Sequence, residues 1–151
     1  MSIQVDVAAD GVRVPVALAR IDALARAVLR KERVHDATLS FTFVGRRAMA
    51  ALNRRHLGHR GATDIITFEL AAAPGVPLGG DVYIAPEIAR EHAAAFGRPV
   101  REEIARLVVH GTLHAIGYTH PEDAGREAST MWERQERYVA RLFPRLAPSR
   151  A

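Results

Sequence analysis

Three histidines and one glycine late in the chain constrain its fold more than any other feature. His110 and His114 stand four residues apart in a segment predicted to be helical, so their side chains share one helix face. Gly117 follows three residues later, where a glycine can end a helix by adopting a positive φ. The sharp turn that results can return His120 to the same point. The motif therefore predicts a helix that ends in a tight turn beside three imidazoles.

Three neutral imidazoles and a water form the ligand set of a catalytic zinc site with one open position. We therefore predict that His110, His114 and His120 bind one Zn²⁺ per chain and carry the catalysis. Three imidazoles also accept nickel or copper, so the identity of the metal stays open. A structural zinc site with four protein ligands is an alternative, because Asp123 lies three residues after His120 and is a potential fourth ligand.

The position after the first histidine separates this chain from a large class of zinc proteases. The metzincin proteases share the spacing H-x3-H-x2-G-x2-H and place a glutamate directly after the first histidine as general base. Gly111 occupies that position here. The missing carboxylate favours a metal-assisted hydrolase whose substrate is not a peptide. A metal-dependent hydrolase of an amide or an ester, with His56 or Glu69 as the base, is the alternative.

A basic segment lies in the first half of the chain. Residues 37–63 contain five arginines and no aspartate or glutamate, whereas the whole chain has a formal net charge of +4. A local basic patch suits a polyanion such as nucleic acid, and a solvated helix face is the alternative interpretation. The segment favours a phosphodiester as the substrate. We predict that four of its side chains bind RNA: Arg54, Arg55, His59 and Arg60.

The composition is that of an ordinary folded domain. The chain has 151 residues, of which 48% are hydrophobic and 25% are charged, so residues 1–151 are expected to form one domain. The absence of cysteine excludes a disulfide scaffold, a thiolate zinc ribbon and cysteine catalysis. The N-terminus shows no signal peptide, and no apolar run is long enough for a membrane span. A cytoplasmic protein without a membrane partner is therefore expected.

Hydrophobic periodicity and breaker residues predict an α/β (α+β) fold, with a four-stranded mixed sheet packed by about five helices. The spacing of the histidine motif adds the expectation of a zincin-like metal site. Prolines and glycines make residues 71–80 a turn-rich loop. The predicted strands are 2–7, 37–44, 63–70 and 81–85, and the predicted helices are 16–33, 46–56, 86–96, 99–117 and 121–143.

The histidine motif and several further blocks resemble the YbeY family over most of the chain. The motif H-G-x-L-H-x-x-G-Y-x-H, residues 110–120, looks like the family signature and is highly specific. The supporting blocks match in order and spacing: Leu52-Asn53 with residues 63–68, residues 78–84, and Met131 with residues 133–136.

The resemblance implies a small α/β fold in which His110, His114 and His120 hold a zinc ion. It also implies a single-strand-specific endoribonuclease that acts in 16S ribosomal RNA maturation and in ribosome quality control. The implied partners are ribosomal RNA and the small ribosomal subunit, with contacts to ribosomal proteins.

Two positions depart from the family pattern. Thr119 stands where the family has an aspartate before the third histidine, and Leu57 stands where it has an important arginine. Whether Arg54, Arg55 or Arg60 supplies the guanidinium that is missing at Leu57 stays open.

Two chemical routes and one non-enzymatic alternative follow from these expectations. Zinc lowers the pKa of a bound water toward about 7 and polarises a phosphoryl oxygen, while arginines hold the phosphate backbone. Attack by hydroxide on the metal and attack by the RNA 2′-OH both stay open, and the general base is unassigned. A ribosome-associated factor with structural zinc is the alternative that is not an enzyme.

Overall fold

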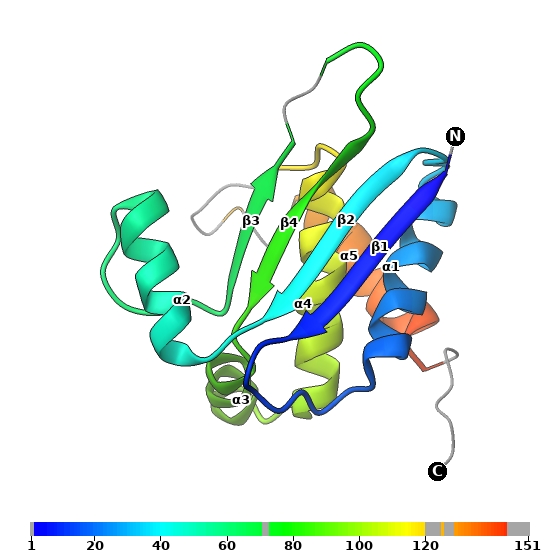
Figure 1. Cartoon of the computed structure of the whole chain (residues 1–151). Coiled ribbons are helices and arrows are strands. Elements are labelled where there is room, and N and C mark those ends of the chain that lie inside the picture. Colours follow the sequence, from blue (N-terminus) through cyan, green and yellow to red (C-terminus); the bar gives the residue numbers. More distant parts are fainter. Residues whose placement is uncertain (1, 71–72, 120–124, 126–128, 145–151) are drawn as a thin grey trace.

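The computed structural model describes residues 2–70, 73–119, 125 and 129–144, which form a four-stranded sheet covered by helices (Figure 1). Strands β1, β2 and β4 are parallel, and β3 pairs with β4 in the antiparallel sense at one edge. This confirms the predicted mixed sheet. The strands, in the spatial order β1-β2-β4-β3, are β1 (Ile3–Ala9), β2 (Ala37–Phe43), β4 (Leu78–Ile84) and β3 (Ile65–Glu69).

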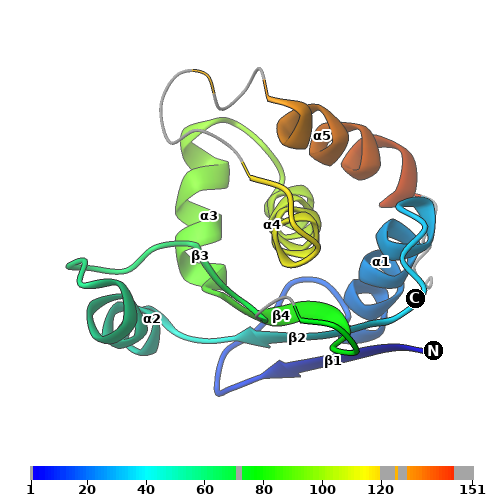
Figure 2. The same ribbon diagram turned by 90° about the horizontal axis from the view of Figure 1, so that it is seen from above.

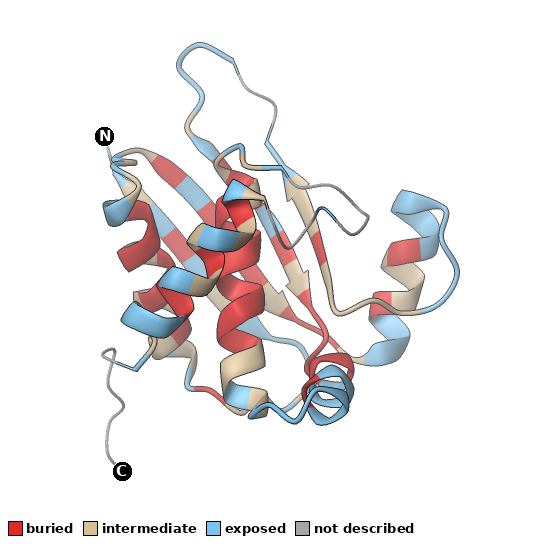
Figure 3. Cartoon of the chain, turned by 180° about the vertical axis from the view of Figure 1, so that it is seen from behind, coloured by how far each residue is buried: buried red, intermediate tan, exposed pale blue. Residues whose placement is uncertain are grey.

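Most helices lie on one face of the sheet, and α4 is at their centre (Figure 2). Alternate residues of β2, among them Leu39 and Phe41, are buried against this helical layer. Figure 3 shows that α4 is buried along most of its length. None of the helices in the described residues is long and apolar enough to cross a membrane. The helices of this layer are α1 (Leu18–Lys31), α3 (Pro86–Ala95), α4 (Val100–Ala115) and α5 (Thr130–Leu142).

The remaining helix, α2 (Arg46–Leu52), packs on the opposite face of the sheet at the β3 edge. Its Met49 joins Ile66 of β3 in a second, smaller core. Alternation puts Ile66 on the face opposite to Ile65, which lies beside α4. The helix continues as a π-helical stretch, η1 (Asn53–Leu57). The structure thus confirms the predicted helix 46–56 and adds a wider last turn, a feature that is frequent at functional sites.

Two glycines make β4 longer than the sequence predicts. The predicted strand starts at residue 81, but β4 begins at Leu78. A Cβ at Gly79 would lie 1.8 Å from the carbonyl oxygen of Thr38 in β2, and a Cβ at Gly80 would lie 2.5 Å from that of Phe68 in β3. The prediction is wrong because these glycines extend the strand, where neighbouring backbones approach too closely for any side chain.

The last helix begins later than the sequence predicts. The predicted helix is 121–143, whereas α5 begins at Thr130; residues 120–124 and 126–128 lie outside the described residues. Ser129 caps α5, because its Oγ accepts a hydrogen bond from the backbone N–H of Trp132 at 3.2 Å. This bond satisfies one of the N–H groups that a helix start leaves without an intrahelical acceptor, and so fixes the start of α5 there.

Candidate functional site

His110 and His114 lie on consecutive turns of α4, at the centre of the helical layer. Their ring centroids are 4.7 Å apart, and the ring planes are inclined by 79°. His110 is buried, with 7% of its surface exposed, and His114 is half-buried. The two imidazoles therefore lie side by side on one helix face, as their spacing predicts.

A chain of hydrogen bonds orients the His110 ring. Its Nδ1 lies 2.7 Å from Gln135 Oε1, and Gln135 Nε2 donates to Glu136 Oε2 at 2.9 Å. Glu136 also accepts two hydrogen bonds from Arg106, at 2.8 and 2.9 Å. Because the Glu136 carboxylate only accepts, Gln135 presents its oxygen to His110, and Nδ1 of His110 carries the proton. In this tautomer the lone pair of the ring is on Nε2.

The buried guanidinium of Arg106 anchors this chain. It also binds Glu102 at 3.0 Å and Glu103 at 2.9 Å. Burial lowers the pKa of Arg106, but its carboxylate partners outweigh that effect and hold the pKa above its ordinary value. Burial raises the pKa of Glu136, but hydrogen bonds from Arg106 and Gln135 more than reverse it and leave the pKa below its ordinary value. Both groups therefore stay charged at neutral pH, and the series of hydrogen bonds from Arg106 to His110 is maintained.

The turn that ends α4 fixes the His114 ring. Gly117 has a φ of 113°, which confirms the positive φ that the motif predicts. The N–H of Gly117 donates to His114 O at 3.0 Å, and the N–H of Tyr118 donates to Leu113 O at 3.0 Å, which are the two bonds of a Schellman motif. The turn brings the Tyr118 carbonyl oxygen to 3.0 Å from His114 Nδ1. His114 therefore also carries its proton on Nδ1 and its lone pair on Nε2.

Glu32, at the end of α1, holds the same turn from the side. Its carboxylate accepts hydrogen bonds from Tyr118 Oη at 2.7 Å, from Arg134 at 3.0 Å and from Tyr138 Oη. Burial and the Glu32 carboxylate raise the pKa of Tyr138 to about 12 and also raise the pKa of Tyr118. Both phenols therefore remain protonated donors near neutral pH. Through them, Glu32 ties α1 and α5 to the turn that follows His114.

The donor set fits a metal ion that prefers imidazole nitrogen. A metal-binding histidine usually donates its other ring N–H to an oxygen, which fixes its tautomer and orientation, and both His110 and His114 do so. His120, the third predicted ligand, and Asp123, the alternative fourth one, lie outside the described residues. Within the described residues no group of three potential ligands comes together. The structure thus brings together two of the three predicted ligands.

Gly111, next to His110, faces the sheet. A Cβ at this position would lie 2.8 and 3.1 Å from the two methyl carbons of Val82 and 3.4 Å from Ile65 Cδ1. A glutamate here would place its carboxylate in the core against β3 and β4. The glycine therefore has a packing role that the spacing of the motif does not reveal: it lets α4 approach the sheet closely.

Gly111→Ala is expected to lower the free energy of unfolding by about 1–3 kcal/mol, because the added methyl group overpacks the contact with Val82. At an exposed helical position the same change would raise stability by about 1 kcal/mol. Urea unfolding measures the difference. The control is a double-mutant cycle with Val82→Ala. Val82→Ala removes the methyl groups that the added methyl group would meet, so it should relieve the overpacking caused by Gly111→Ala. Additive effects of the two substitutions would contradict the proposed contact.

Comparison with known proteins assigns the chain to a family. The sequence model of the family described as Endoribonuclease YbeY matches residues 8–143. The chain belongs to this family. An Endoribonuclease YbeY of Micrococcus luteus is 36% identical over 134 residues, covering 83% of this chain and 84% of its own length. One of Mycobacterium tuberculosis is 35% identical over 140 residues, covering 84% of this chain and 79% of its own.

A solved structure also shares the fold. The solution structure of a Thermotoga maritima protein superimposes with a TM-score of 0.65 at 26% sequence identity, covering 90% of this chain and 87% of that one. An experimental structure of a related sequence therefore has the same overall architecture as this chain.

The two departures from the YbeY pattern lie at solvent-exposed positions. Leu57 ends η1 with 47% of its surface exposed, and Thr119 follows the Schellman turn and is also exposed. Leu57 is followed by Gly58 in the left-handed conformation, which ends η1. Leu57, where the resemblance leads us to expect an arginine, thus lies at the end of a surface element that also carries Arg54 and Arg55.

The predicted RNA-binding residues are divided between two hollows. Arg54 and Arg60 line one hollow together, whereas Arg55 lines a different one with Asp10 and Tyr83. His59 is exposed and lines neither. The structure therefore brings together Arg54 and Arg60 and separates Arg55 from them.

Asn53 organises the loop that carries Arg60. Its side chain is buried, and its Nδ2 donates to the carbonyl oxygen of Gly61 at 2.9 Å. A second bond, from the N–H of His59 to Asn53 O at 3.3 Å, closes the same loop. The Leu52-Asn53 block thus contributes a structural residue to the basic surface.

The two alternative bases differ in position. His56 contacts Phe68 edge-on, with ring centroids 5.2 Å apart. Phe68 belongs with Ile66 to the face of β3 opposite to α4, so His56 lies across the sheet from the imidazole pair. Glu69 is exposed at the end of β3, and alternation puts it on the α4 face. The geometry disfavours His56 as a base for this site.

Three residues that support the site were not among the predicted ones. Gln135 contacts His110 and Glu32 contacts Tyr118 of the turn, both from elements distant in sequence, whereas Arg106 lies on α4 itself and acts through Glu136. The only sequence signal was the closing block at residues 133–136, which contains Gln135. Arg106 and Glu32 have no motif of their own.

Proposed function

We propose that this chain is a zinc-dependent endoribonuclease that cleaves single-stranded RNA and acts in 16S ribosomal RNA maturation and ribosome quality control. The observation that carries the proposal is the pair of tautomer-fixed imidazoles on α4 in a chain of the endoribonuclease YbeY family. His110, His114 and His120 are the proposed metal ligands. When bound, the metal supplies a Lewis acid that polarises a phosphoryl oxygen and lowers the pKa of a water toward about 7.

The roles of the chain's own residues follow from their positions. Gln135 and the Tyr118 carbonyl hold the two imidazoles in the orientation that presents Nε2. Arg54 and Arg60 hold the phosphate backbone, for which the planar guanidinium offers two parallel hydrogen bonds. With the backbone held, a neighbouring 2′-OH stands close to the phosphorus at high effective concentration. The proposed partners are ribosomal RNA and the small ribosomal subunit, with contacts to ribosomal proteins.

Cleavage of a single-stranded RNA that carries one 2′-deoxy nucleotide at the cut site tests the proposal. We expect metal-replete protein to cut the all-ribose RNA, to spare the bond next to the deoxy nucleotide, and to leave peptides intact. Full cleavage at the deoxy position would reject attack by the 2′-OH. Cleavage of no RNA, even with ribosomes added, would reject the nuclease and favour a structural zinc site, and peptide hydrolysis would favour an amide hydrolase.

A further inference from the structure

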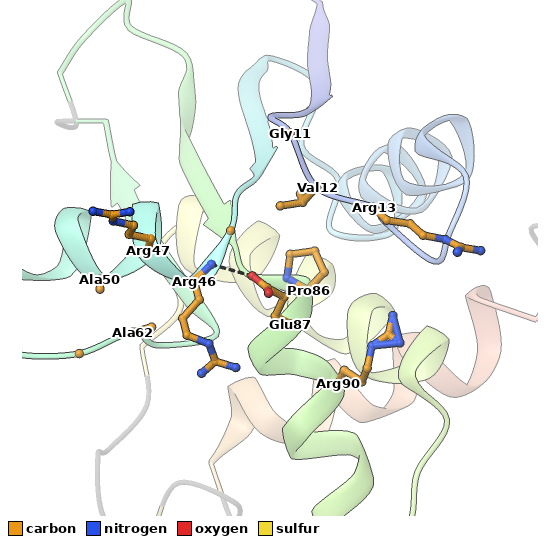
Figure 4. A pocket seen from close by; sticks show the side chains of 12 residues that line it. Gly11, Val12, Arg13, Arg46, Arg47, Ala50, Ala62, Pro86, Glu87 and Arg90 are labelled. Atoms are coloured by element: carbon orange, nitrogen blue, oxygen red, sulfur yellow. Dashed lines mark hydrogen bonds between the residues drawn. The ribbon is translucent and has the colours of Figure 1, made fainter.

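Two adjoining hollows lie at the end of the sheet where β1, β2 and β4 finish. The larger, of about 1010 Å³, is bordered by the loop after β1, by α2, by residues 61–62 and by the start of α3 (Figure 4). The smaller, of about 550 Å³, lies beside α2 and contains Arg54 and Arg60. The hollows share Arg47, Ala50 and Gly61, so they form one continuous surface depression.

Arginine dominates the lining of this depression. We call its six arginines the arginine track: Arg13, Arg46, Arg47, Arg54, Arg60 and Arg90. All six are exposed. The carboxylate in the lining, Glu87, accepts a hydrogen bond from the backbone N–H of Arg46 at 2.8 Å, and the Arg46 guanidinium pairs with Glu91. The other five arginines form no ion pair with any described residue, so the track has a strong positive charge.

The guanidinium groups are spread along the depression. Figure 4 shows Arg47 on the α2 side, Arg13 on the opposite side and Arg90 on α3, with their side chains pointing in different directions. A site for one small anion would need several of these groups to converge on a point. Charges distributed along a groove match a ligand with regularly repeated anions, as in a phosphodiester chain.

The lining also indicates what is recognised. Among the described residues, no aromatic side chain borders either hollow, and glycine, alanine and arginine make up most of the surface. Stacking of bases on aromatic rings, the usual way to hold single-stranded bases, is therefore not provided there. The track can bind phosphates but has little with which to distinguish bases.

A short connection joins the track to the imidazole pair. Gly61 borders both hollows, and Ile65, four residues later, lies against α4 at Gly111, the neighbour of His110. Four extended residues span at most about 14 Å. A phosphodiester strand lying in the track at Gly61 is thus close to the turn of α4 that carries the candidate site.

We infer that the arginine track binds the phosphate backbone of single-stranded RNA beyond the cleavage position, and does so independently of base sequence. This inference rests on the proposed function. It adds Arg13 and Arg90 to the RNA-binding surface; they belong to the loop after β1 and to α3, outside the basic segment. RNA is favoured over an acidic protein segment because the family acts on RNA by name; the guanidinium fork itself would pair with a carboxylate as well as with a phosphate.

The test is the salt dependence of RNA binding by the double variant Arg13→Gln/Arg90→Gln, measured by fluorescence anisotropy with labelled oligo-U and oligo-A. We expect the slope of the logarithm of the RNA-binding constant against the logarithm of the salt concentration to become shallower by up to about 0.7 for each lost phosphate contact, equally for both sequences. The charge-matched control Arg30→Gln/Arg137→Gln removes two exposed arginines of α1 and α5 that line neither hollow, and it should keep the wild-type slope.

Three results would overturn the inference, each in a distinguishable way. Absence of RNA binding by the wild-type protein would remove the proposed function itself. Wild-type binding with an unchanged slope in Arg13→Gln/Arg90→Gln would leave that function standing and reject the track. An unchanged RNA slope combined with weakened binding of a poly-glutamate peptide would assign the depression to an acidic protein partner instead.

Discussion

His114→Ala is expected to abolish cleavage of single-stranded RNA, with a loss of at least about 100-fold, larger than the effect of removing a group that only orients a metal ligand. The substitution deletes a proposed ligand whose ring is held by the Tyr118 carbonyl at 3.0 Å. The Schellman turn is made by backbone groups, so the fold should persist. The measurement is the initial rate of oligonucleotide cleavage, together with the metal content of the purified protein.

His35→Ala is the matched control for this variant. His35 is exposed in the connection between α1 and β2, outside the histidine motif. Its loss should leave both cleavage and metal content unchanged. If His114→Ala kept wild-type activity, the assignment of α4 as the carrier of the catalytic centre would be wrong.

Gln135→Leu is expected to weaken metal binding by about 10- to 100-fold without removing a ligand. The leucine fills a similar volume but takes away the oxygen that accepts from His110 Nδ1 at 2.7 Å. The ring is then no longer fixed in the tautomer that presents Nε2. Titration of metal-free protein with zinc measures the affinity, and urea unfolding in the absence of metal measures any general loss of stability.

Gln135→Glu distinguishes positioning from packing. A buried carboxyl group beside the Glu136 carboxylate is favoured in its protonated form, which keeps both an oxygen acceptor for His110 and a donor to Glu136, so it should recover most of the zinc affinity that Gln135→Leu loses. If both variants bound zinc like the wild-type protein, Gln135 would have no positioning role. If both lost affinity only in proportion to a loss of folding stability, the residue would be purely structural.

The end of α4 was predictable because its determinants are local. The four-residue spacing of His110 and His114 specifies a helix, and Gly117 specifies where it ends. The observed φ of Gly117, 113°, agrees with the positive φ expected there. Such signals depend on residues within two turns of one another. They need no knowledge of the neighbouring elements.

The groups that orient the imidazoles were not predictable because they come from distant parts of the chain. Gln135 lies 25 residues from His110, and Glu32 lies 86 residues from Tyr118. Only the packing of α1 and α5 against α4 brings them together. The same applies to Gly79 and Gly111, whose requirement for glycine comes from backbone or side-chain atoms of neighbouring strands rather than from a turn.

The most direct test of the account is cleavage of a single-stranded RNA before and after removal of metal. Protein stripped with a chelator should show no cleavage, and adding zinc to one equivalent per chain should restore the full rate in the wild-type protein but not in His114→Ala. Full cleavage by the metal-free protein, or no cleavage by the zinc-loaded wild-type protein, would contradict the account.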